Sequence, residues 1–197
     1  MTLTAHEDNT RVMKILAISG SLRAASINSA LLRAASRLAP ADMCVDIFRD
    51  LGNLPLFNPD MEAMDPPLVA AFRAQLNAAD AVLIASPEYA HGVTGAMKNA
   101  LDWMVGCEAF VNKPVALLNA SPRATHAQAS LKEIISVMSA HIVEEASITV
   151  PILGSRLDEE GMVSHAGISA ALHGALQALQ TAVIRHHGDG ANHGARP

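Results

Sequence analysis

The feature that most constrains the fold of this chain is a series of short apolar runs that alternate with amphipathic helical patterns. Residues 15–18 and 81–85 are apolar throughout, which is typical of parallel strands buried on both faces. Further strands are expected at residues 44–48, 114–118 and 142–150. Helices are expected between and after them, at residues 28–38, 66–77, 96–105, 128–140 and 168–184. The alternation predicts one α/β domain, over residues 12–185, with a five-stranded parallel sheet covered by helices on both faces.

The first predicted strand leads into a loop with phosphate-binding chemistry. Hydroxyl, guanidinium and amide groups follow Gly20 in quick succession, at Ser21, Arg23, Ser26 and Asn28. The free N–H groups of a helix start favour an anion, and an arginine can donate two hydrogen bonds to a phosphate. Neither a P-loop nor a G-x-G-x-x-G loop is present, so the hydroxyls suit a terminal phosphate monoester better than a pyrophosphate. The alternative is an ordinary helix N-cap beside a solvated arginine.

Two later loops leave the carboxyl ends of predicted strands with unusual chemistry. Residues 87–95 offer the ring of Tyr89, a carboxylate and backbone amides around Gly92, and residues 119–126 offer the Ser121 hydroxyl. Ligands of parallel sheets bind outside the carboxyl ends of the strands, so these loops are expected to meet the first one. A phosphate at one end and a planar hydrogen-bonding surface at the other describe a mononucleotide such as FMN.

Composition argues against several classes of partner. The net charge of −5 gives no basic field for a nucleic acid or an anionic membrane surface. No apolar run approaches the roughly 20 residues of a membrane-spanning helix, and polar residues 1–11 are unlike a signal peptide. Cys44 and Cys107 form no C-x-x-C pair, so neither a disulfide framework nor a zinc site is expected. These features favour a cytoplasmic protein with a flexible leader at residues 1–11 and a disordered tail at residues 186–197.

Three segments resemble the NADPH-dependent FMN reductase family. They read G-S-L-R-A-A-S-I-N from Gly20, P-E-Y-A-H-G-V-T-G-A-M-K-N-A-L-D-W from Pro87, and K-P-V-A-L-L-N-A-S-P from Lys113. The resemblance covers about residues 14–184. It implies a flavodoxin-like fold, FMN as the cofactor, NAD(P)H as the electron donor, and a quinone or another electron-poor small molecule as the acceptor. It also implies a homodimer or homotetramer, which the apolar loop at residues 54–64 favours as well.

Residue by residue, the resemblance implies FMN contacts in all three loops. The matching residues are Ser21, Arg23, Ser26 and Asn28 in the phosphate loop, Pro87, Glu88, Tyr89 and Gly92 beside the ribityl chain and flavin ring, and Ser121 in the third loop. His91 follows Ala90, which stands where the family commonly has Asn, and is expected to replace that side chain. Thr94 stands where the family often has Pro, so the loop is expected to be less rigid. No catalytic side chain and no metal ligand is expected, because FMN itself supplies the chemistry.

The sequence leaves two alternatives to a reductase open. One is a flavodoxin-like electron carrier, and the other is a flavin-binding scaffold without turnover of its own. Carriers tend to shield the flavin with aromatic rings, whereas this chain has only one Trp, one Tyr and four Phe, and Tyr89 alone lies in a flavin loop. Arg123 and His126 in the third loop are expected either to narrow the site or to recognise an anionic donor.

Overall fold

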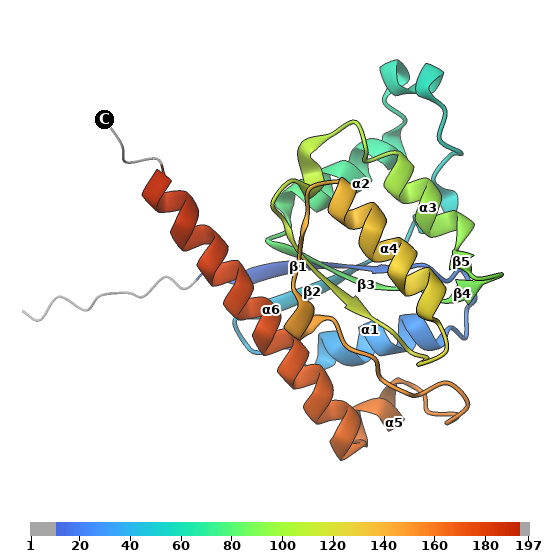
Figure 1. Cartoon of the computed structure of the whole chain (residues 1–197), viewed down its shortest axis with the longest axis vertical. Coiled ribbons are helices and arrows are strands. Elements are labelled where there is room, and N and C mark those ends of the chain that lie inside the picture. Colours follow the sequence, from blue (N-terminus) through green and yellow to red (C-terminus); the bar gives the residue numbers. More distant parts are fainter. Residues whose placement is uncertain (1–10, 194–197) are drawn as a thin grey trace, which may run out of the picture.

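The computed structural model describes residues 11–193, and its central feature is a five-stranded parallel sheet (Figure 1). The strands are β1 (Met13–Ser19), β2 (Met43–Phe48), β3 (Ala81–Ala85), β6 (Pro114–Leu118) and β7 (His141–Ile142). Their order across the sheet is β2-β1-β3-β6-β7, and all four neighbouring pairs are parallel. This is the strand order of flavodoxin-like folds, so the predicted fold class is confirmed.

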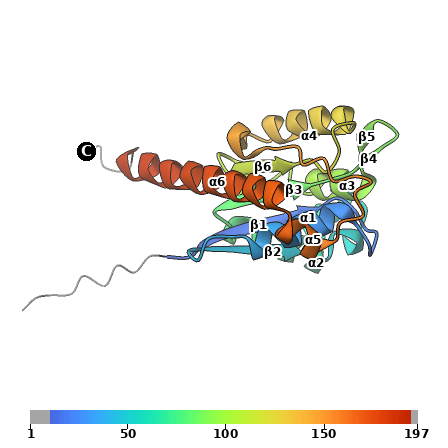
Figure 2. The ribbon, with the colours of Figure 1, turned by 90° about the horizontal axis from the view of Figure 1, so that it is seen from below.

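Helices cover both faces of the sheet (Figures 1 and 2). On one face lie α1 (Ile27–Arg37), α5 (Glu159–Ser164) and α6 (Ala166–His193), and on the other α2 (Pro67–Ala78), α3 (Gly95–Asp102) and α4 (Thr125–Val137). Within β1, Ile15 and Ala17 join the core under α1 and α6, whereas Leu16 and Ile18 join the core under α2 and α3. Burial on both faces is the reason that this strand is apolar at consecutive positions. Across residues 11–193, no helix combines the length and apolar character that a membrane span requires.

The predicted strand over residues 142–150 is wrong for most of its length. β7 has only two residues, and the acidic pair that follows it begins the short 3-10 helix η4 (Glu144–Ala146). The chain returns to the end of β6 only at an isolated bridge near Thr149. Between these points the Ser147 hydroxyl accepts a hydrogen bond from Leu117 N at 3.1 Å. A side chain therefore satisfies the backbone N–H that a continuous strand would have paired.

The helix boundaries also differ from those expected. α4 begins at Thr125 rather than near residue 128, and α5 was not expected at all. α6 continues to His193, past the expected end near residue 184, so residues 186–193 of the predicted tail are helical (Figure 2). The predicted leader, apart from its last residue, and residues 194–197 lie outside the described residues.

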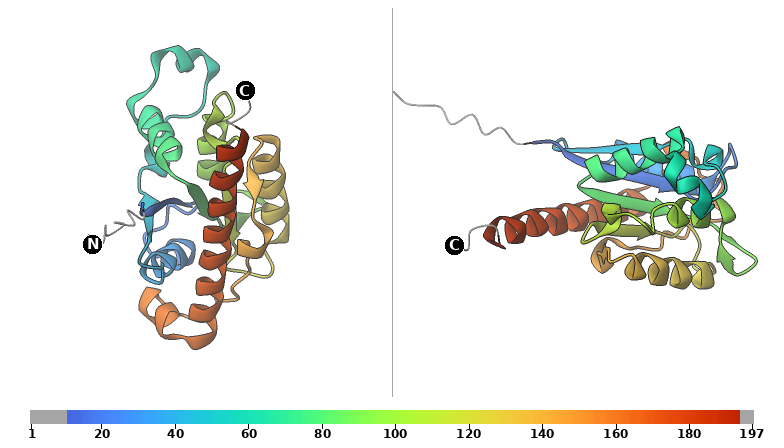
Figure 3. Two further views of the ribbon diagram at one scale, coloured as in Figure 1. Left: turned by 90° about the vertical axis from the view of Figure 1, so that its left-hand side faces the viewer. Right: turned by 90° about the horizontal axis from the view of Figure 1, so that it is seen from above.

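The segment between β2 and α2 loops out from the body of the molecule (Figure 3, left). It contains two short 3-10 helices, η1 (Leu51–Asn53) and η2 (Pro59–Met64). Its base is fixed by Trp103, whose Nε1 donates to Pro55 O at 2.7 Å and whose ring meets Phe57 edge-on. Trp103 is only 2% exposed, so its role is to anchor this segment within the core.

Candidate active site

A cavity of about 790 Å³ opens at the carboxyl ends of β1, β3 and β6. Its walls come from four loops, at residues 21–28, 86–89, 119–124 and 153–158. The first three of these are the loops that the sequence predicts to meet there. The volume falls within the range of small-molecule sites in proteins, about 300–1,000 Å³.

Eight of the ten residues predicted to contact FMN line this cavity. They are Ser21, Arg23, Ser26, Asn28, Pro87, Glu88, Tyr89 and Ser121. The lining does not include the other two, His91 and Gly92. The predicted phosphate loop, the Tyr89 segment and the third loop are therefore brought together around a single space.

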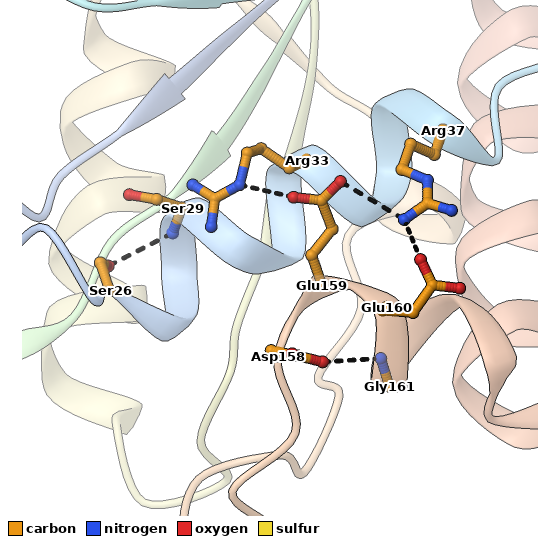
Figure 4. Close-up of polar contacts among 8 residues, drawn as sticks. All are labelled: Ser26, Ser29, Arg33, Arg37, Asp158, Glu159, Glu160 and Gly161. Carbon is orange, nitrogen blue, oxygen red and sulfur yellow. Dashed lines mark hydrogen bonds and ion pairs between the residues drawn. The ribbon is translucent and has the colours of Figure 1, made fainter.

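The residues after β1 bring groups that can bind an anion to the start of α1. Ser26 is the N-cap of α1, and its Oγ accepts from Ser29 N at 3.3 Å (Figure 4). The Ser29 and Ser19 hydroxyls lie 2.8 Å apart, which ties the helix start to the end of β1. No acidic residue occupies the first turn of α1, so the positive end of its dipole is not compensated there. Among the described side chains, no carboxylate forms an ion pair with Arg23.

A buried amide in this loop lacks a hydrogen-bond partner. Asn28 is 5% exposed and lines the cavity, and its Oδ1 is buried without a partner among the described residues. An unpaired buried polar atom of this kind costs about 1–3 kcal/mol, so a ligand group is expected to satisfy it. A half-turn of the amide exchanges Oδ1 with the Nδ2 donor, which can then donate to a phosphate oxygen. The hydroxyls, the helix start, Arg23 and Asn28 together fit the phosphate group of FMN.

Gly20 and Thr94 hold the first two loops together. A Cβ on Gly20 would lie 2.2 Å from Ser86 Oγ, so only glycine allows the end of β1 to approach the end of β3 so closely. Thr94 Oγ1 donates to Gly20 O at 2.7 Å and accepts from Met97 N, which makes Thr94 the N-cap of α3. Thr94 is 4% exposed. Thr94 therefore ties the loop to Gly20 and to α3 by hydrogen bonding, and the expectation of a less rigid loop stays a prediction.

The segment around Tyr89 is a small hairpin, β4 (Glu88–Tyr89) and β5 (Gly92–Val93). Its two turn residues, Ala90 and His91, have φ of 49° and 59°. Positive φ at both positions is the geometry of a type I′ turn, which favours Asn and Gly. The His91 side chain is 76% exposed and outside the cavity lining, so its expected place beside the flavin stays a prediction that the lining does not support.

The described protein atoms around Gly92 leave room for a side chain. A Cβ at this position would meet only Tyr89 O, at an ordinary contact distance of 3.6 Å, and its φ is not positive. The prediction that backbone amides at this glycine approach the flavin stays a prediction. A close approach that requires a glycine lies at Gly20.

Glu88 caps α4 from a distance of 39 residues along the chain. Its Oε2 accepts from Ala127 N at 2.9 Å, in the first turn of α4, and its Oε1 lies 3.2 Å from His91 Nδ1. The Ala127 N–H holds the pKa of the Glu88 carboxyl below its ordinary value. Glu88 lines the cavity, but this oxygen is already engaged, so its main role is to join the hairpin to α4. The cap also explains why α4 begins earlier than its own sequence indicates.

We expect a Glu88→Gln substitution to lower stability near neutral pH but not in acid. A carboxyl whose pKa is lowered by folding stabilises the folded state above its unfolded pKa, and this contribution is lost as the pH falls through the folded pKa. The difference in melting temperature between wild type and variant should therefore shrink between about pH 7 and about pH 3. Thermal unfolding followed by circular dichroism at several pH values measures this. A difference that stays constant over this range would contradict the assigned role of the charge.

The opening of the cavity combines apolar surface with free polar groups. Tyr89 and Leu153 both line it, and they are 59% and 53% exposed. Ser121 Oγ accepts from Arg123 N at 3.3 Å, which leaves its hydroxyl hydrogen free to donate to a ligand. A planar ring with hydrogen-bonding edges suits such a surface.

The sequence analysis missed the fourth wall of the cavity. Residues 153–158 supply Leu153, Gly154, Arg156, Leu157 and Asp158 to the lining. A signal was present, because the same rule about carboxyl ends applies to the segment after Val150, and Gly154 marks a turn with φ of 89°. The expected fifth strand over residues 142–150 coincides with β7 only at Ile142 and pairs with the chain after β6 again only near Thr149.

Comparisons with known proteins identify the family of this chain. The sequence model for NADPH-dependent FMN reductases matches residues 13–152. An NAD(P)H-dependent FMN reductase of Pseudomonas aeruginosa is 36% identical over 182 residues, covering 89% of this chain and 98% of the relative. A 2-hydroxy-1,4-benzoquinone reductase of a Burkholderia species is 34% identical over 157 residues, covering 77% and 85%. The solved structure of FerB, a flavoenzyme NAD(P)H:(acceptor) oxidoreductase of Paracoccus denitrificans, superposes with a TM-score of 0.76 at 27% identity, over 89% of this chain and 99% of that one. The chain belongs to the NADPH-dependent FMN reductase family.

Proposed function

We propose that this protein is an NAD(P)H-dependent FMN oxidoreductase that passes electrons to a quinone-like acceptor. The observation that best supports this is one cavity that joins a phosphate cradle, with the unpaired Asn28 Oδ1, to an open apolar mouth at Tyr89 and Leu153. FMN, when bound, accepts a hydride from the nicotinamide and delivers it to the acceptor. Related reductases of FMN and of quinones share this chain's family.

Each wall of the cavity has a separate role in this proposal. Ser21, Arg23, Ser26 and the Asn28 amide bind the FMN phosphate, and Ser121 donates a hydrogen bond to the flavin. Tyr89 and Pro87 form the wall beside the ring. No side chain needs to transfer a proton for the hydride step from the nicotinamide. The exposed mouth leaves one face of the site open, so that donor and acceptor can occupy it in turn.

The spectrum of the purified protein tests this proposal. We expect visible flavin absorbance that NADPH or NADH bleaches without oxygen and that a quinone then restores. A protein that binds FMN but whose flavin neither donor reduces would be an electron carrier. A protein that binds no FMN would be a scaffold without the cofactor. Both outcomes contradict the proposed activity, and added FMN distinguishes them from simple loss of the cofactor during purification.

We also propose that copies of this chain assemble into a homodimer or homotetramer. The segment that loops out between β2 and α2 exposes Leu56 by 82% and Met64 by 66%. Val105 is 65% exposed, and its neighbour Gly106 lies beside Glu62 of this segment. Large apolar side chains grouped on a surface are typical of protein interfaces. Light scattering at micromolar concentration tests this, and a monomeric mass there contradicts it.

For the compartment, we propose the cytoplasm. Cys44 and Cys107 are both free thiols, and Cys44 is exposed, which suits a reducing environment. NAD(P)H as donor favours the same compartment. Fractionation of cells tests this, and recovery of the protein outside the cytoplasmic fraction contradicts it.

A further inference from the structure

We infer that Arg123 and Arg156 form a second anion subsite, which binds a phosphate group of the nicotinamide donor. The inference rests on the proposed FMN site, because it concerns the cations that the FMN phosphate does not use. Four arginines line the cavity, and they are Arg23, Arg33, Arg123 and Arg156. Four arginines around one cavity concentrate positive charge there, although the chain as a whole has a net charge of −5.

Arg33 already has a partner within the protein. Its Nε donates to Glu159 Oε2 at 2.7 Å, and Figure 4 shows Glu159 between Arg33 and Arg37. These contacts hold the start of α5 against α1 and thereby anchor the far end of the loop at residues 153–158. The other three arginines of the cavity form no ion pair with any carboxylate that the structure describes. Arg23 belongs to the phosphate loop, so Arg123 and Arg156 remain.

The loops that bear these two arginines are joined to each other. Leu153 N donates to Ala120 O at 3.2 Å, which places the loop of Arg156 beside the loop of Arg123. Within the loop of Arg156, the Ser155 hydroxyl donates a hydrogen bond to Ile152 O at 2.7 Å and accepts one from Leu157 N at 3.2 Å. Arg123 and Arg156 therefore line the cavity from two loops that hydrogen bonds hold side by side. Neither comes from the loop that is assigned to the FMN phosphate.

Among the described residues, neither carboxylate of the cavity forms an ion pair with Arg123 or Arg156. Asp158 Oδ1 accepts from Gly161 N at 2.9 Å as the N-cap of α5 (Figure 4). Glu88 Oε2 accepts from Ala127 N in α4. Each of these carboxylates is engaged by a helix start. The positive charge of the two arginines is therefore available to a ligand.

The chemistry of the substrates indicates which ligand this is. A quinone bears no phosphate, whereas both nicotinamide donors bear a pyrophosphate, and NADPH bears a 2′-phosphate in addition. A guanidinium group can donate two parallel hydrogen bonds to a phosphate and is the side chain best suited to that task. The subsite therefore binds a phosphate ester of the donor, and a comparison of NADPH with NADH identifies which one.

The experiment compares Arg123→Gln, Arg156→Gln and the double variant with wild type. Arg185→Gln, an exposed arginine of α6 outside this cavity, is the matched control. For each single variant we expect the KM for NADPH to rise about ten-fold. The FMN content, the KM for the quinone and the kcat at saturating donor should remain unchanged. An unchanged KM for NADH assigns the 2′-phosphate to the subsite, and an equal rise for both donors assigns the pyrophosphate.

Calorimetric titration of the FMN-loaded oxidised protein with NADP⁺ and NAD⁺ provides a readout that does not depend on turnover. The dissociation constants should change in the same pattern as the KM values. Unchanged donor affinity in the double variant overturns the inference, and so does a loss of FMN from it, since the arginines would then hold the cofactor. Failure of the proposed function is distinguishable, because the wild type itself would then bind no FMN or accept electrons from neither donor.

Discussion

A Gly20→Ala variant is expected to lose about 2–3 kcal/mol of unfolding free energy and most of its bound FMN. The new Cβ would lie 2.2 Å from Ser86 Oγ and 2.7 Å from Ser86 Cβ, so one of the two loops must move. Forcing an extra carbon into a packed site costs about 1–3 kcal/mol. Because Ser86 lines the cavity and Gly20 O accepts from Thr94, that movement also displaces the walls of the site. For a domain of this size the melting temperature should fall by roughly 5–10 °C.

Two further variants make this prediction specific. Ser86→Gly removes both atoms that clash and leaves Ser86 Cα at 3.2 Å, so it should recover part of the stability that Gly20→Ala loses. Gly95→Ala is the matched control, because a Cβ there meets nothing within 4 Å and alanine suits the first turn of α3. Equal destabilisation by Gly20→Ala with and without the second substitution would show that the Ser86 contact is not the cause.

The fold was predictable because its strongest signals are local. β3 and β6 begin and end where their apolar runs do, and α1 and α2 begin and end within about one residue of their expected positions. A strand buried on both faces must be apolar throughout, and this requirement is visible in a few consecutive residues. The order of strands then follows from the flavodoxin-like topology that the motifs indicate.

The elements that were predicted poorly depend on partners distant in the sequence. α4 begins early because Glu88 caps it from the hairpin, and no local pattern reveals such a cap. The β-branched run after residue 141 was expected to form a strand, but the chain leaves the sheet after Ile142 and the Ser147 hydroxyl takes the N–H of Leu117. In both cases one side-chain hydrogen bond across the fold decided the local structure.

In the candidate site, too, local motifs were predictable and contacts between distant residues were not. The loop from Ser21 to Asn28 carries several polar side chains close together in the sequence, and these residues line the cavity as predicted. The need for glycine at Gly20 was not predicted, because only the structure shows that Ser86 approaches this residue. The wall at residues 153–158 has no repeated motif, and its place in the site follows from the hydrogen bond between Leu153 and Ala120.

An Arg23→Ala variant is expected to bind FMN about ten-fold or more weakly while binding riboflavin nearly as wild type does. Arg23 lines the cavity beside the start of α1 and forms no ion pair with a described carboxylate, so its guanidinium group is available to the phosphate. A charge-assisted hydrogen bond of this kind contributes about 1.5–3 kcal/mol, and a loss of 1.4 kcal/mol corresponds to a ten-fold change in affinity. Riboflavin lacks the phosphate and therefore cannot sense the loss. Quenching of flavin fluorescence on binding gives both dissociation constants.

The matched control for this prediction is Arg49→Ala, because Arg49 is an exposed arginine that does not line the cavity. It should change neither affinity, whereas a general effect of net charge on flavin binding would appear in both variants. Raising the salt concentration should weaken FMN binding to wild type more than to Arg23→Ala, since screening acts on the charge that the variant has already lost. If Arg23→Ala weakens FMN and riboflavin equally, Arg23 supports the shape of the loop and the phosphate is bound by Ser21, Ser26, Asn28 and the helix start alone.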